Sequence, residues 1–166
     1  MVGLSRNVFT VIRAIFAGGA RDARACATCH FRVTPIDCGT RVLKSDRYLQ
    51  FAESAQLDFL IKTRLIGKLV RRGVHFVNAS QLVKFTKPVL VFSPVRVETC
   101  IVYADAKCAY FSHAMFVRDV QHAEVLVKMK FKKGALTVAP TEIIGPLPDI
   151  RHGYIAAWDQ TLDAMR

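Results

Sequence analysis

The stretch from Ser45 to about Gly67 is the feature that most limits how this chain can fold. Its apolar residues recur at helical spacing but cover most of the circumference: Tyr48, Leu49, Phe51, Ala52, Ala55, Leu57, Phe59, Leu60 and Ile61. A helix that lies on a protein surface keeps one polar side toward solvent, and this stretch has no such side. We therefore expect other elements to wrap a central helix, with Ser45 or Asp46 capping its N-terminus.

After Gly73 the apolar pattern changes to a period of two, which is typical of β-strands. Strands are predicted at 31–36, 74–85, 95–103, 108–117, 123–131 and 136–139, followed by a short terminal helix at 155–165. A sheet of long antiparallel strands that curls around one central helix would bury both patterns in a single core. The predicted fold class is therefore α+β.

The composition fits one domain with a strong positive charge. A chain of 166 residues is long enough for a substantial core, and it contains no apolar run of the roughly 18 residues that a spanning helix needs. The net charge of +11 attracts polyanions, including the phosphates of a nucleotide cofactor, although a solvated basic surface explains it equally well. Since aromatic and basic residues do not interleave, the sequence does not favour nucleic acid as a partner.

The five cysteines are irregularly spaced and odd in number, which argues against a disulfide framework and for a reducing, cytoplasmic compartment. Cys26-Ala27-Thr28-Cys29-His30 has the spacing of a covalent haem attachment site. The rest of the chain resembles no cytochrome, and no further ligands with zinc spacing are present. We interpret the motif as a chance occurrence and expect no cofactor and no metal.

Residues 1–30 differ from the remainder of the chain. Apolar residues recur at helical spacing at Val8, Val11, Ile12, Ile15 and Phe16. They predict an amphipathic helix that packs on the domain, on a partner subunit or on a membrane surface. Arg13 interrupts what would be the apolar region of a signal peptide. The predicted organisation is an N-terminal helix and lead-in at 1–30, a main domain at 31–140, and a C-terminal extension with a short helix at 141–166.

Several stretches of the chain resemble the 4-hydroxybenzoyl-CoA thioesterase-like family of the acyl-CoA thioesterase superfamily, nearest to a branch of short proteins with an N-terminal hydrophobic helix. The matching stretches are 31–37, 47–53, 84–88, 111–117, 123–134 and 156–158. The resemblance implies a hot-dog fold, a curved antiparallel sheet around one long central helix. It also implies acyl-CoA as substrate, a homodimer or homotetramer, and a site at the dimer interface against the N-terminus of the central helix.

The segment before the central helix departs from the family pattern. Family members often carry Asp-x-Asp there, followed by a Gly-His-x-Asn-Asn-like segment, whereas this chain has Asp37-Cys38-Gly39 and then neither histidine nor asparagine before Tyr48. Counting back from Tyr48, the position of the usual carboxylate falls on Cys38. A shift of one residue in the loop would place Asp37 there instead.

Two carboxylates are candidates for the catalytic group. Asp37 is the first choice for base or nucleophile, and its alternative role is to accept backbone hydrogen bonds in the turn. Glu53 lies within the apolar surface of the central helix and is the second choice, because some hot-dog enzymes use a helix glutamate. Its alternative is a structural pairing with Arg47 or with a neighbouring backbone group. A buried carboxylate requires such a partner.

The resemblance also suggests residues that bind the substrate. Tyr48 would form a wall of the pocket, while Arg47, Lys84 and Lys87 would hold the CoA phosphates. Cys38 is a weaker candidate for a nucleophile, since no histidine is near it in sequence to activate the thiol. The functional prediction is hydrolysis of an acyl-CoA or related thioester. The alternative is a non-catalytic hot-dog protein that binds acyl chains or a membrane surface.

Overall fold

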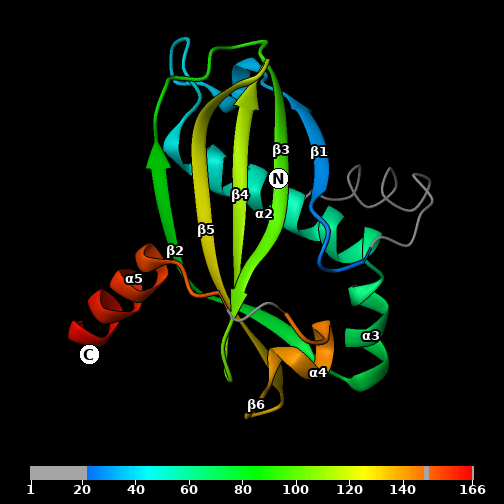
Figure 1. The fold of residues 1–166 in the computed structure, drawn as a ribbon. Helices are drawn as coiled ribbons and strands as arrows, with labels where there is room; N and C mark the ends of the chain where they lie inside the picture. Colours follow the sequence, from blue (N-terminus) through cyan, green and yellow to red (C-terminus); the bar gives the residue numbers. More distant parts are fainter. Residues whose placement is uncertain (1–21, 148–149, 166) are drawn as a thin grey trace.

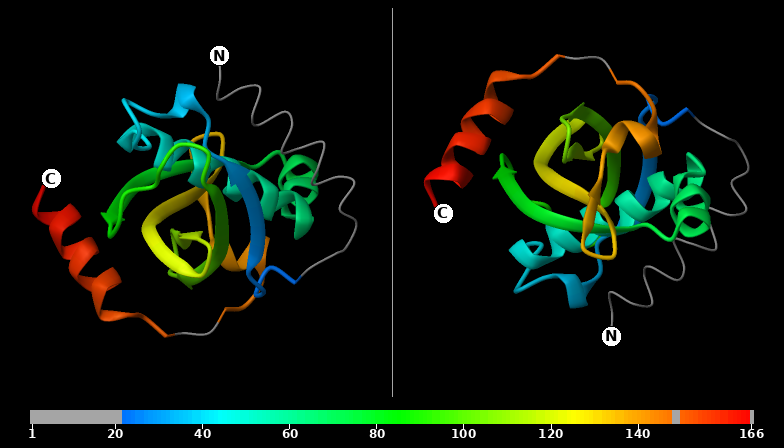
Figure 2. Two further views of the ribbon diagram at one scale, coloured as in Figure 1. Left: turned by 90° about the horizontal axis from the view of Figure 1, so that it is seen from above. Right: turned by 90° about the horizontal axis from the view of Figure 1, so that it is seen from below.

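The computed structural model describes residues 22–147 and 150–165, and its sheet curls around one long helix (Figures 1 and 2). The strands follow the order β1-β3-β4-β5-β2, all neighbours are antiparallel, and β6 pairs with β5. The elements in chain order are β1 (Ala27–Arg32), a 3₁₀ helix (Pro35–Asp37), α2 (Ser45–Lys62), α3 (Leu65–Arg72), β2 (His75–Phe85), β3 (Pro94–Ala104), β4 (Ala109–Val117), β5 (Val120–Lys133), β6 (Leu136–Val138), α4 (Pro140–Ile144) and α5 (Gly153–Ala164). The predicted α+β class and the curved sheet around a central helix are confirmed.

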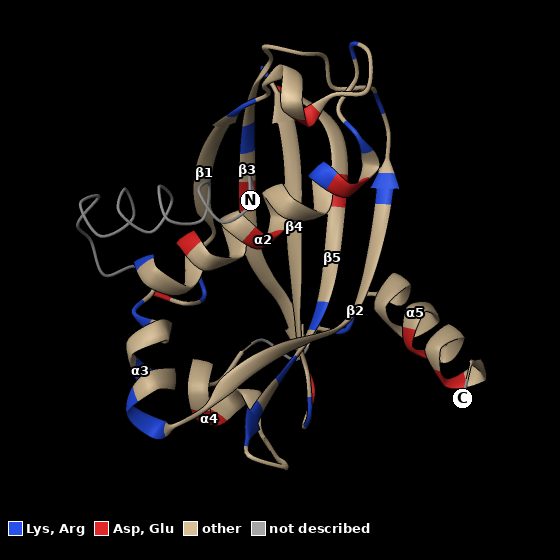
Figure 3. Ribbon diagram, turned by 180° about the vertical axis from the view of Figure 1, so that it is seen from behind, with Lys and Arg blue, Asp and Glu red and all other residues tan. Residues whose placement is uncertain are grey.

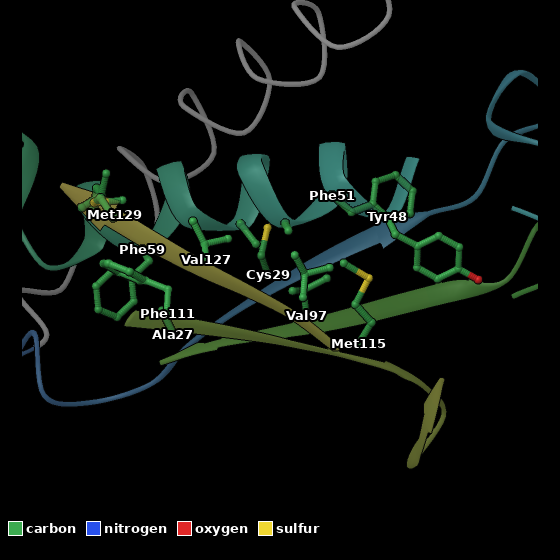
Figure 4. Close-up of a cluster of buried hydrophobic side chains, with 14 of the residues drawn as sticks. Ala27, Cys29, Tyr48, Phe51, Phe59, Val97, Phe111, Met115, Val127 and Met129 are labelled. Carbon is green, nitrogen blue, oxygen red and sulfur yellow. The ribbon is translucent and has the colours of Figure 1, made fainter. Parts of the chain in front are cut away.

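The main core lies between α2 and the concave face of the sheet (Figure 4). Phe51 stacks on Phe31 of β1 with ring centroids 5.0 Å apart, and Phe59 meets Phe111 of β4 edge to face at 5.7 Å. Both α2 phenylalanines are fully buried. Aromatic pairs of this kind add to the large hydrophobic contribution of their buried area. This packing fixes how α2 is rotated and therefore which of its side chains reach the surface.

The central helix is shorter than predicted. It ends at Lys62, where Thr63 donates a side-chain hydrogen bond to the carbonyl of Phe59, and Arg64 follows in the left-handed conformation with φ of 58°. The chain then turns into α3, which buries Leu65 and Leu69. Both leucines belong to the main core, although the helix that carries them is separate from α2.

Two local predictions at the start of the domain are wrong. The first strand occupies Ala27–Arg32 rather than 31–36, because Pro35 begins a 3₁₀ helix instead of continuing the strand. The sheet therefore begins within the segment expected to be a lead-in. The N-cap residue of α2 is Lys44, which makes no side-chain capping bond, and neither Ser45 nor Asp46 caps the helix.

The helix α5 packs on part of the outer face of the sheet, on the side away from α2. Its residues Ile155 and Trp158 pack with Tyr110 and Leu126 in a second, smaller apolar cluster. Asp159 lies beside them and accepts hydrogen bonds from Tyr110 and Lys128. The helix is therefore attached by apolar contacts and by a carboxylate that bonds to two strands.

The expectation that the cysteines form no disulfide is also wrong. Cys26 and Cys100 form a disulfide with a Cα–Cα distance of 4.5 Å. The antiparallel register that pairs Ala27 with Thr99 places these cysteines opposite each other, although they are 74 positions apart in the chain. The odd number and irregular spacing of the cysteines therefore did not exclude a disulfide.

The haem-like motif is divided between the two faces of β1. Cys26 is exposed and joined to Cys100, whereas Cys29 lies in the core with 6% of its surface exposed. Side chains three residues apart in an extended segment point to opposite faces. The two cysteines are therefore not presented to one macrocycle.

Basic side chains lie along β5 and on α3 (Figure 3). On α3, Lys68 donates to the carbonyl of Ile143 and Arg72 donates to the carbonyl of Glu142, both in α4. Cations near the last carbonyls of a helix are favourable, since that end carries a partial negative charge. Part of the basic charge therefore holds two helices together.

The predicted N-terminal amphipathic helix lies outside the described residues. In the part of the chain that is described, no helix is both long and apolar enough to cross a membrane.

Candidate active site

Asp37, the first candidate for the catalytic group, is buried within the turn that precedes α2. Its carboxylate oxygen Oδ2 accepts hydrogen bonds from the backbone N–H of Thr34 at 3.0 Å and from the Thr34 hydroxyl at 2.7 Å. Its carbonyl accepts from the N–H of Lys44, the residue before the helix. None of the Asp37 surface is exposed. The side-chain bonds form the capping box of the 3₁₀ helix, with Thr34 as its N-cap, and the backbone bond ties this helix to the residue before α2.

Cys38 is also buried, with 4% of its surface exposed. Burial raises the pKa of the Cys38 thiol, and the neighbouring Asp37 carboxylate raises it further against the opposing charge of Lys44. The nucleophile in thiol chemistry is the thiolate, which this environment disfavours. The environment therefore does not suit Cys38 to the role of nucleophile.

A hollow of about 350 Å³ lies at the N-terminus of α2. Its lining residues are Val42, Leu43, Ser45, Tyr48, Phe85, Thr86, Lys87 and Pro88. Burial raises the pKa of Tyr48, against a hydrogen bond with the backbone of Val89, so its hydroxyl stays protonated. The lining of this hollow combines apolar side chains with the Ser45 and Thr86 hydroxyls and the Lys87 ammonium group, and it contains no carboxylate.

Glu53 is exposed, contrary to the expectation that it lies in the buried surface of the helix. It lines a second hollow of about 430 Å³ between α2 and β2, together with Gln56, Leu57, Phe76, Val77 and Asn78. The rotation of α2 set by its phenylalanines leaves Glu53 beside β2, the last strand of the sheet. This carboxylate can therefore reach a ligand.

The second hollow also contains an amide pair that the sequence analysis missed. Gln56 is only 2% exposed, and its Nε2 donates to Oδ1 of Asn78 at 3.2 Å. Its Oε1 receives no hydrogen bond from any residue within the described ranges. The signal in the sequence was a glutamine three residues after Glu53, inside an otherwise apolar helix.

The predicted binding residues do not all converge. Tyr48 and Lys87 line the first hollow. Arg47 lies beside Asp46 and donates to Gln50 at 2.6 Å, so it pairs with these residues rather than with Glu53. Lys84 lies on the outer face of β2, in a smaller hollow of about 240 Å³ with Glu124 and Tyr154. Within the described part of the chain, no cluster of His, Cys, Asp and Glu is suited to hold a metal ion.

The sequence of the central helix and of the strands around it matches a known protein family. Residues 42–143 match the thioesterase-like superfamily. The chain belongs to that superfamily. The match covers the central helix with Glu53 and the strands that form both hollows, and it begins after Asp37 and Cys38.

Solved structures of thioesterases share the hot-dog fold of this superfamily member. YbaW, a probable thioesterase from Escherichia coli, is 14% identical with a TM-score of 0.67, over 71% of this chain and 96% of that one. The 4-hydroxybenzoyl CoA thioesterase of Pseudomonas sp. strain CBS-3 is 18% identical with a TM-score of 0.62, over 72% and 96%. BH1999, a gentisyl-coenzyme A thioesterase, is 20% identical with a TM-score of 0.60, over 72% and 98%.

Proposed function

We propose that this protein hydrolyses acyl-CoA thioesters, with Glu53 as the general base, at a site that two copies of the chain form together. The observation that carries the proposal is the exposed Glu53 carboxylate in a hollow beside the free edge of β2. Membership of the thioesterase-like superfamily supports the class of reaction. Asp37, which is buried and already bonded to Thr34, then has a positioning role.

The shape of β2 supports a dimer. This strand is 11 residues long, lies at the end of the sheet, and exposes 45% of Val77, 44% of Leu82 and 53% of Phe85. A long edge strand with exposed apolar side chains is a template for pairing with another chain. Pairing of β2 with β2 of a second copy would continue the sheet and would cover the hollow that contains Glu53.

The length of α2 supports a site that is shared between copies. Glu53 is about 12 Å along the helix from Ser45, given a rise of 1.5 Å per residue. One thioester group is too small to contact both the carboxylate and the donors at the start of the same helix. In a dimer, the start of α2 from the partner can supply the donors that polarise the carbonyl, while Glu53 activates water.

Thiol release from a panel of short, medium, long and aromatic acyl-CoAs tests the proposal. We expect turnover by the wild type, and a decrease in kcat of about 100-fold or more in Glu53→Gln, because general-base catalysis contributes roughly that factor. Glu98→Gln, which changes a glutamate on the outer face of β3, is the matched control and should keep full activity.

The variant Asp37→Asn distinguishes the role of the Asp37 carboxylate from that of Glu53. We expect it to keep most of its turnover and to lose stability, since a neutral amide is a weaker acceptor for Thr34. Loss of turnover in a folded Asp37→Asn protein with an active Glu53→Gln protein would reverse the assignment. A folded, dimeric wild type that releases no thiol from any substrate would favour an acyl-binding protein instead.

A further inference from the structure

Large apolar side chains are exposed at the end of the molecule where β2 leads into β3 and β4 turns into β5 (Figure 1). Leu90 exposes 54% of its surface, Phe92 61% and Val120 44%. All three line one hollow of about 570 Å³. Val42 belongs to the same group, because it is 40% exposed and forms a β-bridge with Leu90. We call these four residues the apolar tip, and an exposed apolar patch of this kind commonly marks a site of interaction.

Backbone hydrogen bonds hold the apolar tip in place. The N–H of Ser93 donates to the carbonyl of Leu90 at 3.2 Å and closes a four-residue turn that contains Phe92. The N–H of Phe92 donates to the carbonyl of Val33 at 2.9 Å, and the N–H of Val33 donates to the carbonyl of Ser93 at 3.0 Å. Because the turn is bonded to the segment that follows β1, its side chains are presented from a fixed backbone.

Phe92 adopts a conformation that is unfavourable for an aromatic residue. It occupies the third position of the turn with a φ of 65°, in the left-handed region where Gly or Asn is usual. A bulky residue there is an outlier, and such strained residues are concentrated at functional sites. Packing within the chain does not account for the ring, since most of Phe92 is exposed. A contact outside this chain does account for it.

Basic side chains surround the apolar tip. Lys87 and Arg118 line the same hollow, and the exposed Arg41 is next to the tip in sequence. Among the described residues that line the hollow there is no Asp or Glu. Asp119, which follows Arg118, is exposed and pairs with Arg96 at 3.6 Å. The partner that fits this end of the molecule therefore combines an apolar layer with negative charge.

We propose that the apolar tip docks on the surface of a bilayer that contains anionic phospholipids. At such a surface apolar side chains enter about 5–10 Å, to the boundary of the acyl chains, while Lys and Arg bind the phosphates above them. Phe92 and Leu90 supply the apolar contacts, and Lys87 and Arg118 supply the charges. The hollow at the N-terminus of α2 shares Lys87 and Pro88 with this end, so docking places its opening at the bilayer.

Sedimentation of the whole chain with vesicles tests the proposal. We expect the wild type to bind vesicles of phosphatidylcholine and phosphatidylserine, to bind phosphatidylcholine alone more weakly, and to be released by salt. Phe92→Asn should lower the affinity about 10-fold, since burial of the ring in the bilayer is lost. It should not lower the melting temperature, because Asn accepts the left-handed conformation. Arg118→Gln should lower the affinity about 5-fold.

Val70→Asn provides the matched control. Val70 lies on α3, is 74% exposed and is followed by Arg71 and Arg72, so it places an exposed apolar side chain beside cations elsewhere on the molecule. This variant should bind the vesicles as tightly as the wild type. An equal loss of affinity in Val70→Asn and Phe92→Asn would overturn the proposal, because any apolar residue beside cations would then suffice.

Other results would also overturn the proposal. A wild type that does not bind the anionic vesicles, or that binds them no more tightly than Phe92→Asn, would exclude docking through the tip. A smaller molecular mass of Phe92→Asn without vesicles would assign the tip to a contact between copies of the chain. The proposal does not depend on the proposed activity, so a protein that binds vesicles through the tip but releases no thiol would leave it intact.

Discussion

His113 shows how strongly the interior of this protein acts on a single residue. It lies on the core face of β4, fully buried, with Nδ1 3.0 Å from the hydroxyl of Thr99. Burial lowers the pKa of His113 to about 3, because the charged imidazolium would lose its hydration. The folded protein therefore holds this residue neutral over most of the pH range.

The neutral His113 predicts a loss of stability in mild acid. The unfolded chain takes up the proton below an ordinary pKa of about 6.5, whereas the folded chain does not, so the free energy of unfolding falls as the pH falls from about 6.5 toward 3. Between pH 7.5 and 5 this single residue should cost about 2 kcal/mol. Urea unfolding at both pH values measures the loss.

The control for this prediction is His113→Gln, which retains a polar group but does not titrate. Its stability should change less between pH 7.5 and 5 than that of the wild type. Equal losses in the two proteins would show that other groups cause the acid sensitivity.

At the scale of elements, α5 is held to the sheet by one carboxylate as well as by apolar contacts. Asp159 accepts from Tyr110 at 2.7 Å, from Lys128 at 2.6 Å and from Arg151 at 2.6 Å. Burial alone would raise the pKa of Asp159, but these hydrogen bonds outweigh burial and hold it below the ordinary value. The carboxylate therefore stays ionised and joins α5 to β4 and β5.

Removal of this carboxylate should loosen α5. We expect Asp159→Ala to lower the free energy of unfolding by about 1–3 kcal/mol, because Lys128 and Tyr110 each lose an acceptor. Gln160→Ala, at an exposed position in the same helix, should have almost no effect. Thermal unfolding of both variants, with the fluorescence of Trp158 as a local probe, compares them. Equal stability of the two variants would contradict the assigned role.

The disulfide between Cys26 and Cys100 joins β1 to β3 at the end of β1 where the described sheet begins. A bond that closes a loop of this length is expected to stabilise the fold by about 2–4 kcal/mol. Reduction should therefore lower the melting temperature of the wild type. A protein with both cysteines changed to serine should melt at the reduced value and be insensitive to reductant. A wild-type melting temperature that is the same with and without reductant would exclude this contribution.

At the scale of the whole molecule, the free edge of β2 and the proposed activity are linked. Leu82→Lys places a charge among the exposed apolar side chains of this strand, where pairing with a second copy would bury it. We expect the variant to be monomeric in sedimentation experiments and to lose thioesterase activity without unfolding. Leu136→Lys, at a more exposed leucine on β6, should leave both properties unchanged. A monomer with full activity would contradict a shared site.

Much of the architecture was determined by the sequence alone. The alternating pattern from His75 to Lys133 predicted the long strands β2 to β5 within a few residues, because side chains in a strand alternate between two faces whatever surrounds them. Apolar residues around most of the helix at 45–62 likewise predicted that this helix is central, since those side chains need contacts on several sides. Local periodicity is a property of the chain, so it can be read without knowing the fold.

Only the tertiary structure decided what these elements present to a ligand. The rotation of α2 exposed Glu53 and buried Gln56, the turn before α2 enclosed Asp37, and the register of β1 against β3 joined Cys26 to Cys100. Each outcome depends on contacts between residues far apart in the chain. The spacing of residues in the sequence predicts which of them lie on the same face of a helix or strand. The packing of that element decides whether the face meets the core, a hollow or solvent.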